Sequence, residues 1–159
     1  MKMSNLRTVI ADVALIVSLV FVGFEVHQNT EIARGQARQD LAALNQEWLA
    51  MMSQDVELNE LWGRAFGSKA QLTATERNRV FFLVLLNLRR MENVFLQHEE
   101  GLVDESALAS YGLQVPAAFL SQRFRDTWTQ VSTSFDPRFV VFFNQRLVAA
   151  AQGRTRGGA

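Results

Sequence analysis

The chain has 159 residues, enough for one domain with a short appendage and a buried core. It contains no cysteine, which excludes disulfides and thiolate metal sites, and its 16 basic residues balance its 16 acidic ones, which gives no reason to expect a nucleic-acid partner. Two prolines stand against twelve phenylalanines and many leucines, valines and alanines, a composition that predicts an all-α protein.

The chain opens with an apolar segment, in which residues 13–24 carry no charge and one polar side chain, Ser18. Twelve helical residues cover only about 18 Å of a hydrocarbon core roughly 30 Å thick. Residues 8–26 are long enough, and their carboxylates, Asp12 and Glu25, lie near the two ends, where they can reach the headgroups. The Val, Leu, Ile and Phe side chains contribute about −5 kcal/mol to insertion. We therefore predict a membrane-spanning helix that contacts lipid through residues 8–26.

Two other interpretations of this segment stay open. Lys2 and Arg7 precede the apolar run as they would in a signal peptide, but no small-x-small cleavage site follows it. The segment is also apolar enough for the core helix of a soluble bundle, although it shows no polar face over three turns. We expect a retained single-pass anchor at residues 1–28. The positive-inside rule gives it no orientation, because the basic residues on its two sides balance.

The next segments carry the signals of a helical bundle over residues 29–150. The opening helix is expected to continue as an amphipathic one, with a bend at Gly35 where it leaves the membrane. Asp55 and Gly67 have the positions of the N-cap and the C-terminal glycine of a short helix. The T-x-x-E sequence that begins at Thr73 is a capping box, which predicts the start of a long helix.

The C-terminal half continues the bundle. Gly101 is suited to end the long helix, and a further helical pattern covers residues 104–111. Pro116 is predicted to begin a helix, and Pro137, which follows an aspartate, to begin the last one. Residues 151–159 are small and glycine-rich, so we expect a disordered tail.

Several motifs follow one another in an order that suggests a family. They are the apolar start closing in EVHQNTEIARGQA, then DVELNELW, LTATER, RRMENVFLQHEEGLVD and FDPRFVVFF. In these features the chain resembles a widespread group of uncharacterised small bacterial proteins with one N-terminal transmembrane helix and a helical domain. The resemblance covers most of the chain up to about Leu147, and its motifs are structural. It implies an anchor in the bacterial cytoplasmic (inner) membrane, and it implies no activity.

The long helix carries most of the candidate functional groups. At 100° per residue, Asn87, Met91 and His98 fall on one stripe, while Asn93 falls on another, with Glu92 at its margin. One interpretation places these five residues around a pocket for a ligand. The other assigns Asn87 and His98 to hydrogen bonds in the core or at the helix end, and Glu92 to an ion pair on the helix surface. The sequence favours this second interpretation.

No known catalytic motif occurs. The only histidines are His27 and His98, and Phe95 stands where a Glu-x-x-His pair would need a glutamate, so we expect neither a di-iron nor a zinc site. There is no G-x-S-x-G nucleophile motif and no glycine-rich phosphate loop. We therefore expect no enzyme activity and no cofactor. The weaker alternative is an enzyme that uses Glu92 and His98 as acid and base.

Two further apolar stretches bear on function. Residues 81–88 are bracketed by arginines, which favours a buried core helix over a second span. Residues 139–143 fit core packing better than a surface for a partner. The leading hypothesis is a membrane-anchored helical module that binds a protein partner or self-associates as a homo-oligomer. The alternative is a sensor domain that holds a small apolar molecule between its helices.

Overall fold

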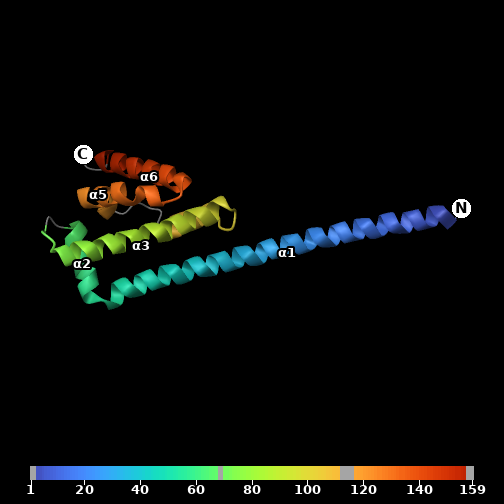
Figure 1. Ribbon diagram of the computed structural model, residues 1–159, viewed down its shortest axis with the longest axis horizontal. Coiled ribbons are helices and arrows are strands. Elements are labelled where there is room, and N and C mark those ends of the chain that lie inside the picture. The colour runs from blue at the N-terminus through green and yellow to red at the C-terminus, as the bar shows by residue number, and fades with distance from the viewer. Residues whose placement is uncertain (1–2, 68–69, 112–116, 157–159) are drawn as a thin grey trace.

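The computed structural model describes residues 3–67, 70–111 and 117–156, and within them it contains helices and no strand. The fold is therefore all-α, with a long apolar N-terminal helix followed by a helical bundle, as the composition predicts (Figure 1). In chain order the elements are α1 (Met3–Gln54), α2 (Val56–Gly67), α3 (Ala74–Glu99), α4 (Glu105–Ser110), η1 (Ala117–Leu120), α5 (Gln122–Val131), η2 (Ser132–Ser134) and α6 (Pro137–Arg156).

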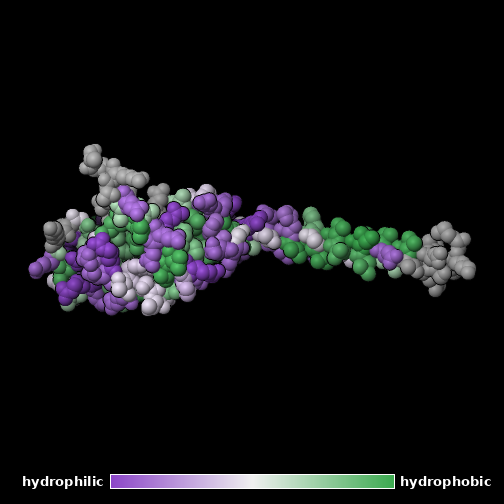
Figure 2. Space-filling view, turned by 90° about the horizontal axis from the view of Figure 1, so that it is seen from above, coloured by the Kyte–Doolittle hydropathy of each residue, from purple (hydrophilic) through white to green (hydrophobic). Residues whose placement is uncertain are grey.

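The first helix, α1, is a single element of 52 residues, roughly 78 Å long at 1.5 Å per residue. Residues 9–36 are exposed on every side, and the side-chain packing of α1 begins only at Ala37. Within the described ranges, α1 is the one helix long and apolar enough to cross a membrane. Figure 2 shows this apolar part of α1 projecting from the bundle, with a hydrophilic stretch between the two.

The bend expected at Gly35 is not formed, because α1 runs through this residue without interruption. One glycine inside a helix costs only about 1 kcal/mol relative to alanine. The neighbouring Arg34 side chain supports the helix here, since its Nη1 donates to Glu31 at 2.8 Å and its Nε donates to the Gly101 carbonyl at 3.2 Å. The bond to Gly101 also fixes α1 beside the turn that follows the C-terminal end of α3.

The bundle is built around α3, which contacts α1, α2, α4, α5 and α6. Its inner face and four phenylalanines from η1, α5 and α6 form the fully buried centre of the core. Those phenylalanines are Phe119, Phe124, Phe139 and Phe143. Trp128 joins them from α5, and its Nε1 donates to Asn144 of α6 at 2.8 Å. Residues 81–88 and 139–143 thus belong to core helices, each with one exposed face.

The predicted helix starts are confirmed where the sequence carries a cap. The Thr73 hydroxyl accepts from the Glu76 amide at 3.2 Å and the Thr73 amide donates to the Glu76 carboxylate at 2.8 Å, which completes the capping box of α3. Asp55 accepts from the Leu58 amide at 2.9 Å at the start of α2. Asp136 accepts from the Arg138 amide at 2.8 Å beside Pro137, the first residue of α6.

The end of α3 depends on a glycine. Gly101 has φ 71°, a left-handed conformation that a side chain would strain. Its amide donates to the His98 carbonyl at 2.9 Å, and the Leu102 amide donates to the Gln97 carbonyl at 2.9 Å. This pair of bonds is a Schellman motif, which satisfies two carbonyls that the helix itself leaves free.

One predicted boundary lies outside the described residues, and another differs from the structure. Helix α5 begins at Gln122, where the Ser121 hydroxyl caps it by accepting from the Phe124 amide at 3.2 Å, whereas Pro116 lies outside the described residues. Helix α6 continues to Arg156, six residues into the segment predicted to be disordered. The run of alanines at 149–151 favours the helix strongly enough to carry it into this segment. Residues 157–159 lie outside the described part.

Candidate functional site

The five residues considered as a pocket lie in different surroundings. Met91 is completely buried in the core, Asn87 and Glu92 are buried polar groups, and Asn93 and His98 are half-buried. Their hydrogen bonds lead to different neighbours. Asn87 accepts from Arg90, which also bonds Asn45 of α1. Glu92 accepts from the backbone amide just before α6, and His98 bonds a backbone carbonyl in the turn after α3. Asn93 accepts from Gln97 on the same helix at 3.1 Å. The five side chains therefore do not meet around one cavity.

His98 serves the end of α3. Its Nδ1 lies 3.2 Å from the Val103 carbonyl, just beyond the turn that Gly101 makes. A histidine near a helix C-terminus also interacts favourably with the carbonyl end of the helix dipole. This is the helix-end role that the sequence favoured.

Glu92 joins α3 to the turn before α6. Its Oε1 accepts from the Asp136 amide at 2.7 Å, and its Oε2 accepts from Arg89 Nη1 at 2.7 Å. Arg89 Nη2 donates in turn to the Ser134 carbonyl at 2.9 Å, and its guanidinium lies 4.0 Å from the centre of the Phe135 ring. Both carboxylate oxygens are thus engaged in holding the backbone between η2 and α6.

Asn87 holds a different arginine. Its Oδ1 accepts from Arg90 Nη2 at 3.1 Å, while Arg90 Nη1 donates to Oδ1 of Asn45 on α1. The guanidinium also lies 5.9 Å from the centre of the Trp48 ring. Burial lowers the pKa of Arg90, and its Nε is buried without a hydrogen-bond partner. Sequence reasoning did not single out Arg90. The one signal in the sequence was its position three residues after Asn87, which places the two side chains on neighbouring positions of the helix surface.

Arg90 lies in an apolar groove between α1 and α3. The part nearest Arg90 has a volume of about 350 Å³ and is lined by Leu44, Glu47, Trp48 and Met51 of α1 and by Leu86, Arg89, Arg90 and Asn93 of α3. A second hollow of about 370 Å³ is lined by Met51, Asp55, Leu58, Arg79, Phe82, Leu83 and Leu86. The two hollows are neighbours that share Met51 and Leu86 in their linings, and together they are called here the α1–α3 groove.

The apolar lining of the α1–α3 groove is open to solvent. Phe82 is 58% exposed, Leu86 51% and Leu44 38%, although α3 and this part of α1 also supply the buried core. Large apolar side chains that line a shared hollow and remain this exposed are typical of a binding surface. Only Asn93, of the five residues proposed from the sequence, lines this groove.

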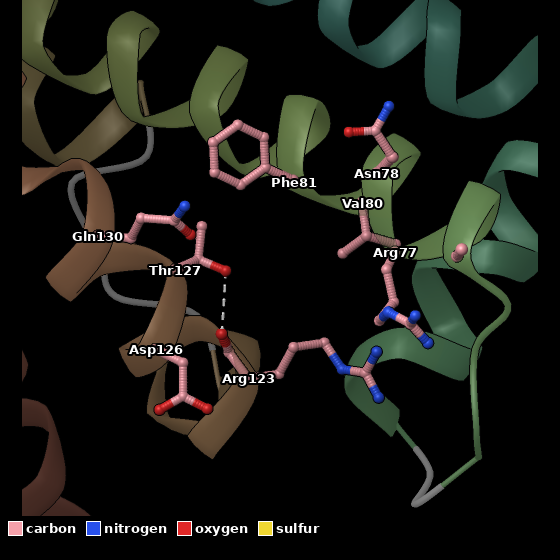
Figure 3. A pocket seen from close by; sticks show the side chains of 9 residues that line it. Arg77, Asn78, Val80, Phe81, Arg123, Asp126, Thr127 and Gln130 are labelled. Atoms are coloured by element: carbon pink, nitrogen blue, oxygen red, sulfur yellow. Dashed lines mark hydrogen bonds between the residues drawn. The ribbon is translucent and has the colours of Figure 1, made fainter.

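A second cleft lies between α3 and α5, with a volume of about 490 Å³ (Figure 3). Its most prominent groups are Arg77 and Arg123, whose guanidinium groups lie at the same end of the cleft. Arg77 Nη1 donates to the Leu72 carbonyl at 2.6 Å, and Arg123 Nη2 donates to the Ala70 carbonyl at 3.3 Å. Both arginines therefore fasten the segment before α3, and the cleft is better explained as packing than as a site.

Acidic and histidine side chains do not assemble a metal centre in the described ranges, where no three of them form a group that could hold an ion. The proposed acid and base do not bond one another, since His98 bonds a backbone carbonyl and Glu92 bonds Arg89 and a backbone amide. Glu92 and His98 thus have separate structural partners.

The chain matches no protein-family model, no curated protein and no solved structure. The resemblance to the group of small bacterial membrane proteins therefore stays a prediction. Function is inferred from the geometry of the chain itself, in which the α1–α3 groove is the feature with the shape and lining of a binding site.

Proposed function

We propose that the protein is a single-pass anchored module of the bacterial inner membrane that binds a helix of a protein partner in the α1–α3 groove. The observation that carries this proposal is the groove itself, an open apolar channel formed by the same helix that continues from the apolar N-terminal segment. The proposal has two parts, an anchor and a docking surface.

The anchor is supported by the exposure of α1. Residues 9–26 expose a belt of large apolar side chains, with Leu15 and Leu19 each 70% exposed. Such a surface far exceeds the apolar patches that soluble monomers tolerate, and no residue of its most apolar stretch is buried in the bundle. A bilayer would cover these apolar side chains completely. The helix can enter the bilayer because its backbone N–H and C=O groups are already hydrogen-bonded to one another.

The position of the groove follows from the length of α1. From Phe24 to Leu44 the helix rises about 30 Å, so the groove lies well outside the hydrocarbon core. The mainly polar, exposed stretch at residues 27–36 forms a stalk of about 15 Å between the two. An occupant of the groove therefore comes from the aqueous phase or from another protein that extends out of the membrane.

The length of the groove favours a helix over a compact small molecule. Its lining extends from Leu44 to Met51 on α1, about 11 Å, and from Arg79 to Asn93 on α3, about 21 Å. This is about two helical turns of α1 and about four of α3. Amphipathic helices bind such grooves by placing apolar residues at three- and four-residue spacing along them. The sensor hypothesis stays the alternative, and of the five residues proposed to line its pocket Asn93 is the one that lines this groove.

Site-specific photo-crosslinking in intact cells tests this function. A photoreactive amino acid at Leu86, in the middle of the groove, should give a discrete crosslinked species with a protein partner. The same residue at Val141, which is 58% exposed on α6, is the matched control and should give none. Absence of an adduct at Leu86, or equal adducts at both positions, would contradict the docking proposal. An adduct of twice the mass of the chain would mean that the partner is a second copy.

A further inference from the structure

We infer that the partner helix is acidic, and that the α1–α3 groove selects it by pairing a carboxylate of the partner with the guanidinium of Arg90. This inference rests on the proposed docking function and adds the chemistry by which the partner is recognised. It is drawn from the one arginine of α3 that combines partial burial and a position in the groove with the absence of an ion pair among the described residues.

Arg90 differs from the other arginines that line the groove. Arg79 is paired with Asp55 at 3.9 Å, and Arg89 is paired with Glu92 at 2.7 Å. The ion pairs of the described residues do not include Arg90, whose hydrogen bonds go to two neutral amide oxygens. A partly buried charge without a counter-charge is unfavourable, and a ligand that supplies the counter-charge relieves that cost.

The guanidinium has donors left for such a ligand. A guanidinium carries five N–H groups, of which one on each Nη is given to Asn45 or Asn87. The Nε–H is buried. One hydrogen on each Nη remains, and Arg90 contributes to the wall of the groove. Each remaining N–H group can donate to an oxygen of a carboxylate.

The other charges around Arg90 leave room for this pairing. On α3, the neighbouring Arg89 is already neutralised by Glu92 and also bonds Ser134. On α1, Glu47 lines the same part of the groove but is not within ion-pair distance of Arg90. The basic group that an incoming carboxylate meets at the groove wall is therefore Arg90.

Spacing along α3 defines the partner further. Leu86 lies four residues before Arg90, about 6 Å along the helix, and Phe82 lies eight residues before it, about 12 Å. A partner helix that packs apolar residues against Leu86 and Phe82 therefore needs its Asp or Glu about one turn beyond the nearer apolar residue. A helix with Lys or Arg at that place would meet like charge and be rejected.

Synthetic peptides on the full-length protein test this. The protein is placed in lipid nanodiscs, which keep detergent out of the groove, and fluorescein-labelled helical peptides of about 15 residues are titrated by anisotropy. The peptides share leucines at three- and four-residue spacing and differ in one residue beyond the stripe, which is Glu, Gln or Lys. We expect the Glu peptide to bind at least about tenfold more tightly than the Lys peptide, with a preference that weakens as salt rises.

Four variants test whether the effect depends on Arg90 and on the groove. Arg90→Gln should remove the preference for Glu over Lys, and Arg90→Lys should retain part of it because the charge stays. Leu86→Gln should weaken all the peptides without changing the charge of the groove, while Val141→Gln should change nothing. Should Arg90→Gln lose helical content, the comparison of the three peptides on the unaltered protein still decides the inference.

The outcomes separate the two proposals. Equal binding of the Glu, Gln and Lys peptides that is still sensitive to Leu86→Gln would overturn acidic selection and leave the docking groove standing. Failure of every peptide to bind would overturn both. Dodecanoate below its micellar concentration is the last probe: if it binds in an Arg90-dependent manner and excludes the peptides, the occupant is a small anionic amphiphile and the helix proposal is wrong.

Discussion

The buried side chain of Glu92 connects α3 to distant backbone. Its two oxygens accept one hydrogen bond from Arg89 and one from the amide of Asp136, 44 residues along the chain. Such a group stabilises the fold, whereas a group kept for function is often neutral or costly for stability. Measuring what its loss does to stability therefore distinguishes the two roles.

Glu92→Ala should lower the free energy of unfolding by roughly 2 kcal/mol, because it leaves the Asp136 amide and the Arg89 guanidinium without their acceptor. Thermal melting followed by circular dichroism measures this as a fall in Tm of several degrees. Glu60→Ala is the control, since Glu60 is exposed on α2 and its loss should stay within about 0.5 kcal/mol. A Glu92→Ala variant as stable as the wild type would return Glu92 to the list of functional candidates.

At the scale of whole helices, sequence reasoning was most successful where the signal is local. The capping box at Thr73, the cap at Asp55 and the glycine after α3 each involve residues within a few positions of one another, and the structure forms all three. It failed at Gly35, where the general preference of glycine for a break was weaker than the contacts of a neighbouring side chain.

The groove and the surroundings of Arg90 could not be predicted in the same way. Asn45 and Arg90 are 45 residues apart, and their contact depends on the register in which α1 packs against α3. Helical periodicity shows which residues share a face of one helix, but it does not show which face of another helix lies opposite. The exposed side chains Phe82 and Leu86 therefore read as ordinary core positions in the sequence.

The start of α3 gives a prediction for pH. The amide of Thr73, together with the Arg64 side chain, lowers the pKa of Glu76 from 4.5 to about 2. The pKa in the folded state is below that in the unfolded state, so this stabilisation is complete above about pH 4.5 and is lost as the pH falls toward 2. The difference in Tm between wild type and Glu76→Gln should therefore shrink over this range.

Thr73→Ala is the matched control for the pH measurement. It removes the other half of the capping box and should cost about 1 kcal/mol, but a hydroxyl does not titrate in this range. The difference in Tm between Thr73→Ala and wild type should thus vary less with pH than that of Glu76→Gln. Parallel pH profiles for the two variants would show that the charge of Glu76 contributes nothing at this helix start.

The whole molecule is an apolar helix with a bundle attached to its distal half. Arg34 and Arg38 of α1 contact Gly101 and Asp104, at 3.2 Å and 3.4 Å respectively, so the turn after α3 is fixed beside the stalk. The groove lies along the middle of α3, from Arg79 to Asn93. With the apolar part of α1 in a membrane, this arrangement would hold the groove away from the lipid and accessible to a partner.

The anchor itself is tested by fractionation. Full-length protein should remain in the membrane pellet after an alkaline carbonate wash, because about twenty apolar helical residues insert too favourably to be released by loss of charge contacts. A chain that begins at Thr30 should be found in the supernatant with its helical content intact, since the described side chains of α1 pack only from Ala37 onward. Release of the full-length protein by carbonate would show that α1 does not span the bilayer. Its exposed apolar belt would then have to be covered by protein, and the groove would no longer be the main candidate for an interface.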